Sequence, residues 1–347
     1  MEITVEKLLL KFKKPSGTSR GILYEKPSWI IKITNKHGVT GVGEFSVIPG
    51  LSPDYENDFL YELQIQKAID FLKSSFENGF QNINKEFVIQ FKDSPSIIFG
   101  VETALLDLFN GGKEILFDND FSRGLASIPI NGLIWMGNNE EMQNQIDEKL
   151  SLGFQTIKLK IGAIEVKEEL ALIEKLRQKY SSEQITIRVD ANGAFGFEKA
   201  KEILLKLKEL EVHSIEQPIK AGQLQQMKEL CELNILPIAL DEELIGVKEK
   251  ADKIKLLDFI RPQYIILKPS LHGGIFGCTE LIELAEQRNI GWWMTSALES
   301  SIGLNAIAQF TAQYNVQIPQ GLGTGGLYTN NLPSQLVIEA GKLIMRR

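Results

Sequence analysis

Hydrophobic and polar residues alternate along the first part of the chain, a pattern that predicts antiparallel strands. Three segments alternate in this way, at residues 2–12, 27–35 and 39–45. Residues 54–91 and 94–112 instead carry apolar side chains at helical spacing, and the second of these segments ends at a Gly-Gly pair. The beginning of the chain is therefore expected to form a three-stranded meander followed by helices, an α+β unit.

From residue 128 onward the pattern changes to short apolar strands that alternate with amphipathic helical segments. The expected strands lie at residues 128–134, 156–161, 186–192, 213–218, 237–243, 264–269, 291–301 and 316–325. Such alternation indicates a parallel sheet, and this number of units suits a closed barrel. We expect an α+β capping domain at residues 1–125, a barrel at residues 126–329, and a tail at residues 330–347 that packs back on the first domain.

The composition is typical of a globular protein that acts on a small molecule. Of the 347 residues, 43% are hydrophobic and 24% are charged, and the net charge of −7 argues against a nucleic-acid partner. No apolar stretch is long enough to span a bilayer and the first residues lack a secretory pattern, so we expect a cytoplasmic protein without a membrane partner. Cys231 and Cys278 show no metal-ligand spacing, and the sequence predicts no particular oligomeric state.

Charged residues recur at the ends of the expected barrel strands. In the segment TIKLKIG, Lys158 and Lys160 are two apart and therefore face the same side of a strand. Further strands end in charged residues at intervals of 25 to 30 residues, the length of one strand-helix unit. These residues are Asp190, Glu216, Asp241 and Lys268. Because the carboxyl ends of barrel strands meet around one mouth, we expect these side chains to converge.

The three acidic side chains in this set predict a metal ion. Asp190, Glu216 and Asp241 cannot all stay ionised at close range without a cation, because like charges raise one another's pKa. They supply oxygen, the ligand type that suits Mg²⁺, and no His or Cys stands at a corresponding strand end. We therefore expect one Mg²⁺, for which Mn²⁺ would substitute.

The lysines in the set suit proton transfer. A lysine acts as a general base near neutral pH only if its pKa falls from about 10.4 toward roughly 7–8. Lys158 and the metal ion would place two positive charges near Lys160, so that Lys158 tunes the pKa and Lys160 exchanges the proton. With Lys268 on the opposite side of the barrel, this assembly suits removal of a weakly acidic proton beside the carboxylate of a small-molecule substrate.

Longer motifs carry a resemblance that covers almost the whole chain. They are GVGEFSVIPGLS, KLKIG, RVDANGAF, IEQP, LDEE, ILKPSLHGG and SALESSIGL. Through them the sequence resembles the muconate-lactonizing-enzyme-like group of the enolase superfamily. The resemblance implies a (β/α)7β TIM-like barrel with an N-terminal α+β capping domain. It also implies that Asp190, Glu216 and Asp241 bind the metal, that Lys160 is the acid/base residue and that Lys268 is the opposite lysine.

Within this group, the segments GEFSVIPGLS and SALESSIGLNAIAQ are similar to those of o-succinylbenzoate synthases of menaquinone biosynthesis. That similarity implies a hydro-lyase that removes water, with syn geometry, from 2-succinyl-6-hydroxy-2,4-cyclohexadiene-1-carboxylate. Lys160 would take the proton beside the ring carboxylate and return it to the departing hydroxide, with Mg²⁺ stabilising the enediolate. Lys268 would stabilise the anion electrostatically.

Two other functions remain open. The same lysine pair could racemise an N-acylamino acid or epimerise a dipeptide. Dipeptide epimerases of this group usually carry an Asp-x-Asp after the final strand, where this chain reads GLGTGGLYTNN without an acidic residue. A catalytically inactive binding barrel would have no use for both lysines and all three carboxylates.

Loops around the mouth supply six candidate substrate contacts. They comprise an arginine for a carboxylate, side chains at the end of the seventh strand for the succinyl tail, and glycines that leave room near the backbone. These residues are Arg20, Ser296, Glu299, Ser300, Gly321 and Gly323. Asn192 is expected either to orient a metal-bound water or to shape a turn.

Overall fold

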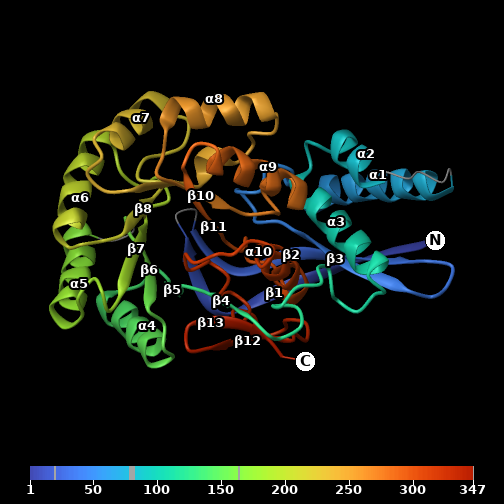
Figure 1. Ribbon diagram of the computed structural model, residues 1–347, viewed down its shortest axis with the longest axis horizontal. Coiled ribbons are helices and arrows are strands. Elements are labelled where there is room, and N and C mark those ends of the chain that lie inside the picture. The colour runs from blue at the N-terminus through green and yellow to red at the C-terminus, as the bar shows by residue number, and fades with distance from the viewer. Residues whose placement is uncertain (19–20, 78–82, 163–164, 347) are drawn as a thin grey trace.

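A three-stranded antiparallel sheet, in the order β1-β2-β3, forms the first layer of the protein (Figure 1). Its strands are β1 (Glu2–Thr18), β2 (Gly21–Thr34) and β3 (Thr40–Ser46). The computed structural model describes residues 1–18, 21–77, 83–162 and 165–346. Ile31 and Ile33, two apart in β2, are both buried, because alternate side chains of a strand share one face.

Three helices pack with this sheet: α1 (Asp58–Glu77), α2 (Ile83–Gln90) and α3 (Pro95–Phe109). Strand and helix side chains share one apolar core, which includes Trp29, Ile31, Phe45, Tyr61 and Ile98. The meander and the helices that follow it were both predicted from the periodicity of the sequence. Helix burial is what stabilises this unit, since helices of this length gain most of their stability from packing an apolar face.

Glycines let α3 approach β3 more closely than larger residues would permit. A Cβ atom on Gly43 would lie 2.0 Å from the carbonyl oxygen of Gly100, and one on Gly41 would lie 2.0 Å from that of Ala104. Both oxygens belong to the backbone of α3, so neither can move aside as a flexible side chain would. The spacing between the sheet and α3 therefore depends on these two glycines.

A second, parallel sheet contains seven strands in the order β11-β10-β9-β8-β7-β6-β5. The strands are β5 (Gly132–Ile134), β6 (Thr156–Lys160), β7 (Thr186–Asp190), β8 (Ser214–Glu216), β9 (Ile238–Leu240), β10 (Tyr264–Leu267) and β11 (Gly291–Met294). A helix follows most of these strands, and Figure 1 shows α4 to α8 curving around the sheet. The connecting helices are α4 (Asn139–Ser151), α5 (Val166–Lys179), α6 (Phe197–Glu209), α7 (Leu224–Glu232), α8 (Lys250–Ile260), α9 (Gly274–Glu286) and α10 (Ser301–Thr311), with a short 3-10 helix at Glu242–Leu244.

Residues 320 and 321 bring the two edges of this sheet together. Gln320 donates its backbone N–H to Pro129 and accepts from Asn131, beside β5. Gly321 donates to Met294 of β11 and accepts from Ser296. The predicted last strand at residues 316–325 is thus reduced to isolated parallel bridges, because each residue pairs with a different neighbour. The predicted (β/α)7β TIM-like barrel with its α+β capping unit is confirmed as the fold class.

The first predicted barrel strand and the tail differ in detail from the expectation. Residues 128–134 divide into β5 and a separate strand, β4 (Ser127–Pro129). β4 forms a small antiparallel sheet with β12 (Leu336–Glu339) and β13 (Lys342–Met345). At the start of the tail, the side chain of Asn330 hydrogen-bonds the β1 backbone at Leu9 and Lys11, and the packing of the tail on residues 1–125 stays a prediction.

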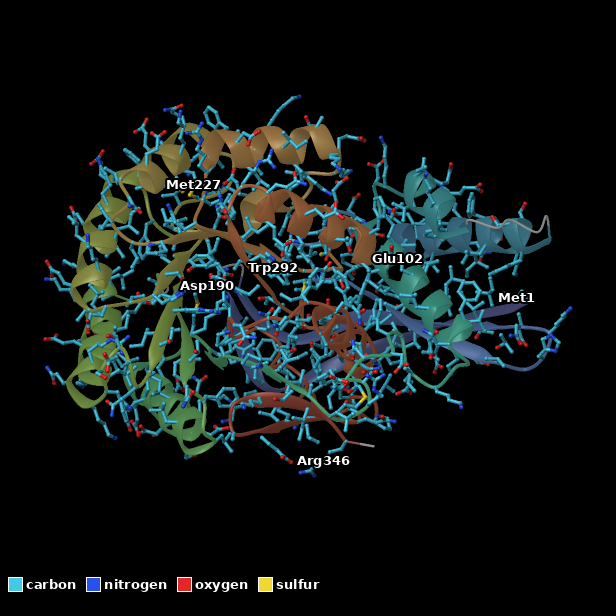
Figure 2. The ribbon with its side chains drawn as sticks, in the orientation of Figure 1. Met1, Glu102, Asp190, Met227, Trp292 and Arg346 are labelled. Atoms are coloured by element: carbon cyan, nitrogen blue, oxygen red, sulfur yellow. The ribbon has the colours of Figure 1, made fainter. Side chains whose placement is uncertain are left out.

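Helix α3 also connects the first unit to the barrel. Its Glu102 accepts hydrogen bonds from the backbone N–H groups of Ile275 (2.6 Å) and Phe276 (3.2 Å) at the start of α9 (Figure 2). A carboxylate at a helix N-terminus satisfies free N–H groups and interacts favourably with the helix dipole.

The predicted boundary near residue 125 falls between α3 and β4 and stays a prediction. No helix in the described part of the chain is long and apolar enough to cross a bilayer.

Replacing Gly43 by Ala should lower the free energy of unfolding by about 1–3 kcal/mol or more, because the added methyl group meets the α3 backbone. Gly196→Ala is a matched control, since nothing lies within 4 Å of a Cβ at that position and its φ is −74°. Urea unfolding followed by far-UV circular dichroism compares the two variants. Equal transitions for both would show that β3 and α3 are not in backbone contact.

Candidate active site

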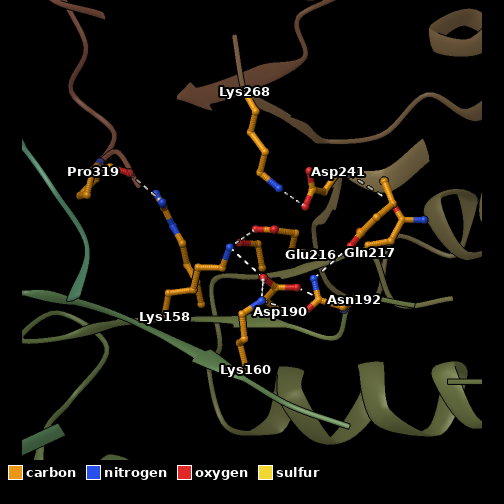
Figure 3. A network of polar contacts seen from close by, with 12 residues as sticks. Lys158, Lys160, Asp190, Asn192, Glu216, Gln217, Asp241, Lys268 and Pro319 are labelled. Carbon is orange, nitrogen blue, oxygen red and sulfur yellow. Dashed lines mark hydrogen bonds and ion pairs between the residues drawn. The ribbon is translucent and has the colours of Figure 1, made fainter. Parts of the chain in front are cut away.

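The register of the parallel strands places the charged strand ends side by side. Lys160 at the end of β6 pairs in register with Asp190 at the end of β7, and Asp190 pairs with Glu216 at the end of β8. In-register neighbours on adjacent strands point to the same face of a sheet. Asp241 directly follows β9 and Lys268 directly follows β10, so the predicted set converges on one end of the barrel (Figure 3).

Lys158 is buried between two carboxylates. Its Nζ donates to Glu216 Oε2 at 2.5 Å and lies 3.0 Å from Asp190 Oδ2. Burial lowers the pKa of Lys158, but the charges of Asp190 and Glu216 outweigh this effect and hold the pKa above its ordinary value. Lys158 therefore remains a fixed positive charge, which suits the tuning role that the sequence predicted for it.

Lys160 shares one oxygen atom with Lys158 and has a second partner of its own. Its Nζ lies 3.0 Å from Asp190 Oδ2 and donates to Asn192 Oδ1 at 2.7 Å. The carboxamide of Asn192 is fixed in turn, because its Nδ2 donates to Glu242 Oε1 at 3.1 Å. Asn192 adopts a left-handed backbone conformation with φ of 44°, so it shapes the turn and also orients the lysine.

Lys268 pairs with Asp241 through a short hydrogen bond to Oδ2. Burial lowers the pKa of Lys268, but the charges of Asp241 and Glu216 outweigh it and raise that pKa. Burial and the nearby charge of Asp190 raise the pKa of Glu216 well above its usual range. The cluster holds three lysines and three carboxylates, and the raised pKa of Glu216 reflects its burial and the close approach of Asp190 and Asp241.

The carboxylates have free coordination capacity for a cation. Glu216 Oε1 and Asp241 Oδ1 are buried and have no hydrogen-bond partner among the described residues. In the same part of the chain, no three acidic, His or Cys side chains are gathered into a complete set of metal ligands. Asp190 Oδ2, Glu216 Oε2 and Asp241 Oδ2 each face a lysine. The two orphaned oxygens nevertheless fit the hard-oxygen ligand set of Mg²⁺.

A cavity of about 160 Å³ lies over this cluster. All six charged residues of the predicted set line it: Lys158, Lys160, Asp190, Glu216, Asp241 and Lys268. The first unit covers it with Gly21, Ile22 and Leu23 from the start of β2, and with Ile48, Pro49 and Leu51 after β3. An apolar cover of this kind excludes water and strengthens the electrostatic interactions inside.

The predicted substrate contacts separate into three groups. Ser296, Gly321 and Gly323 line the cavity. Glu299 and Ser300 are not among its described lining residues. Arg20 lies outside the described residues.

Glu299 and Ser300 lie behind the cavity wall and connect the two units of the fold. Glu299 accepts hydrogen bonds from the hydroxyl groups of Ser270 and Ser296, both at 2.6 Å. Ser300 donates its backbone N–H and its hydroxyl to Glu44 of β3, which also accepts from the N–H of Gly303. Glu44 thereby caps α10 from the first sheet and fixes the wall segment that precedes this helix.

Lining residues that were not predicted include Asn131, Trp135 and Thr324. Asn131 and Trp135 flank the short strand β5, and the backbone of Trp135 is held by Gln145 of α4 through two hydrogen bonds. Trp135 directly follows β5, and this position at the carboxyl end of a barrel strand was the signal that could have identified it, since such positions carry site residues in this type of fold.

Comparison with known proteins defines the class to which this fold and site belong. Residues 141–345 match the family model described as Enolase C-terminal domain-like. The chain belongs to this family, which confirms the enolase-superfamily resemblance of the sequence. The charged residues at the barrel mouth lie within the matched segment.

Individual relatives differ in how similar they are to this chain. The chain is 46% identical over 366 residues to the o-succinylbenzoate synthase of Desulfotalea psychrophila, covering 99% of this chain and 98% of the relative. It also aligns with the crystal structure of MenC from that organism at a TM-score of 0.84 and 43% identity, covering 99% of both chains. The L-Ala-D/L-Glu epimerase of Bacillus subtilis is more distant, at 25% identity over 328 residues, 90% of this chain and 84% of the epimerase.

Replacing Lys158 by Met should lower the free energy of unfolding by roughly 3–5 kcal/mol in metal-free buffer, because Asp190 and Glu216 lose a buried counter-charge. Lys167→Met, on the exposed side of α5, is the control and should change stability by less than about 0.5 kcal/mol. Urea titrations with a chelator present measure both. A Lys158→Met transition that coincides with the wild type would rule out the buried network as a stabilising element.

Proposed function

We propose that this protein is a lyase that catalyses the o-succinylbenzoate synthase reaction, the syn dehydration of 2-succinyl-6-hydroxy-2,4-cyclohexadiene-1-carboxylate to 2-succinylbenzoate. The observation that carries the proposal is the placement of Lys160 and Lys268 around one cavity with Asp190, Glu216 and Asp241. Near full-length identity of 46% to a synthase supports it.

We further propose Mg²⁺ as the cofactor, held by Asp190, Glu216 and Asp241, with Mn²⁺ as a substitute. The orphaned oxygens of Glu216 and Asp241 support this assignment. When bound, the ion supplies positive charge where negative charge develops on the substrate carboxylate. As an enzyme of this pathway, the protein would act in the cytoplasm and contribute to menaquinone biosynthesis.

Lys160 performs the proton transfers in this proposal. Its ammonium is anchored by Asp190 and Asn192, which fix the direction in which Nζ approaches a ligand in the cavity. As a free amine it removes the proton beside the ring carboxylate, and as an ammonium it returns that proton to the departing hydroxide on the same face. One residue acting on one face accounts for the syn geometry. General acid-base catalysis of this kind is worth about 10²- to 10⁴-fold in rate.

Lys158 and Lys268 act as fixed charges. Lys158 is held between Asp190 and Glu216, where it keeps a positive charge two residues from Lys160 on the same strand. Lys268 approaches from the far side of the cavity and stabilises the anion that forms when the proton leaves. Because the product ring is aromatic, the protein mainly positions the substrate and compensates charge.

The second candidate is N-acylamino acid racemisation, which needs a proton donor on each face of an α-carbon. Lys160 and Lys268 approach the cavity from different strands, β6 and β10, and so fit this requirement as well. Dipeptide epimerisation is less favoured, since residues 321–331 contain no carboxylate for a substrate ammonium. Epimerase relatives are also more distant than the synthase.

Replacing Lys160 by Ala should reduce turnover of the cyclohexadiene carboxylate by about 10²- to 10⁴-fold with Mg²⁺ present, because the general base is removed. Loss of the diene absorbance measures the rate. The control Lys167→Ala, on the surface of α5, should retain wild-type turnover. If the wild type does not turn over the diene but incorporates solvent deuterium into an N-acylamino acid, the assigned function changes from synthase to racemase.

Saturating Mg²⁺ should raise the melting temperature of the wild-type protein by several degrees, since ligand at 100 times its Kd stabilises the folded state by about 2.7 kcal/mol. Glu216→Gln should abolish most of this shift, whereas the exposed Glu229→Gln should preserve it. Differential scanning calorimetry with and without the ion measures both. An undiminished shift in Glu216→Gln would place the cation elsewhere.

A further inference from the structure

The catalytic cavity shares part of its wall with a second chamber. This chamber has a volume of about 810 Å³ and lies between the end of β1, helix α4 and the segment after residue 322. The residues that line both spaces are Asn131, Leu133, Trp135, Gly323 and Thr324. At about 160 Å³ the catalytic cavity is smaller than the roughly 300–1,000 Å³ typical of ligand sites, so a substrate seated on the lysines extends toward this shared wall.

Two polar side chains in the shared wall have no partner. Asn131 Oδ1 and Thr324 Oγ1 are buried without a hydrogen bond to any described residue, although the two residues are only 3% and 5% exposed. Buried polar atoms are nearly always hydrogen-bonded, so these two atoms are available to a ligand that enters the cavity. The two residues come from different segments that meet where residues 320 and 321 close the barrel.

The chemistry of this pair suits an oxyanion. A threonine hydroxyl donates a hydrogen bond, and a carboxamide can turn its Nδ2–H toward the same point. The walls of the second chamber add three lysines and two glutamates, a net positive lining that favours an anion over a cation. They are Lys13, Lys14, Lys149, Glu141 and Glu148. The hydroxyl of Ser296, by contrast, is already engaged with the carboxylate of Glu299.

We propose that Asn131 and Thr324 form the subsite for the distal carboxylate of the substrate's acyl tail. This assignment rests on the proposed function and extends it, because it names the residues that select a dicarboxylate. The ring carboxylate lies at the lysine cluster, and the tail crosses the cavity beside the apolar face of Trp135 to reach the shared wall. Neither residue touches the reacting carbon, so both act on binding rather than on proton transfer.

The test compares two ligands that differ only at the distal end: 2-succinylbenzoate and 2-butanoylbenzoate, in which a methyl group replaces the distal carboxylate. Calorimetric titration of the Mg²⁺-loaded enzyme gives the ratio of the two dissociation constants. Thr324→Val and Asn131→Leu should each reduce the wild-type preference for the succinyl ligand by about tenfold, the value of one hydrogen bond to a charged group. General damage to the fold would weaken both ligands alike and leave the ratio unchanged.

Thr311→Val is the matched control, since its hydroxyl is buried and donates to the carbonyl of Ile307, outside both cavities. Its ratio should equal that of the wild type. In turnover assays, the two subsite variants should raise KM about tenfold and keep kcat within about twofold.

The outcomes separate this inference from the function on which it rests. If the wild type turns over the diene but both subsite variants keep the wild-type ratio of dissociation constants, the subsite alone is overturned. A wild type that neither turns over the diene nor binds 2-succinylbenzoate would overturn the proposed function and the subsite with it.

Discussion

The register of the parallel barrel strands is the constraint on which the site depends. It sets Lys160, Asp190 and Glu216 side by side on three consecutive strands, where the two carboxylates are buried and Lys160 is partly buried. Isolated charges at this depth would cost several kcal/mol each, so each must be compensated by another. A shift of one residue in any strand would turn its charge to the other face of the sheet and leave its partners unpaired.

The first unit completes the site from outside the barrel. Glu44 caps α10 and Glu102 caps α9, so two carboxylates from the sheet and from α3 hold the starts of two barrel helices. The same unit places apolar residues over the cavity mouth. Catalytic charge is thus supplied by rigid strands, while enclosure is supplied by segments whose position depends on contacts between the two units.

This division explains why related proteins can share a catalytic core and differ in substrate. In the proposed reaction, a lysine pair with three carboxylates removes a proton beside a carboxylate, whatever the rest of the molecule binds. Discrimination falls to the cavity wall, where this chain presents Asn131, Trp135 and Thr324, and where residues 321–331 contain no acidic side chain. In this proposal the wall decides between a dicarboxylate and a substrate that carries an ammonium group.

The sequence by itself determined most of the strands, the barrel and the six charged residues, because a strand's periodicity and its last residue are local properties repeated at a regular interval. Tertiary structure decided the rest. The hydroxyl of Ser300 hydrogen-bonds Glu44, 256 positions away, and Glu299 accepts a hydrogen bond from Ser270. Local spacing in the sequence does not encode these contacts. The last strand became isolated bridges, and β12 and β13 paired with β4 rather than with the first sheet. Such outcomes depend on which distant groups meet, since each buried polar group takes the partner that the completed fold brings within reach.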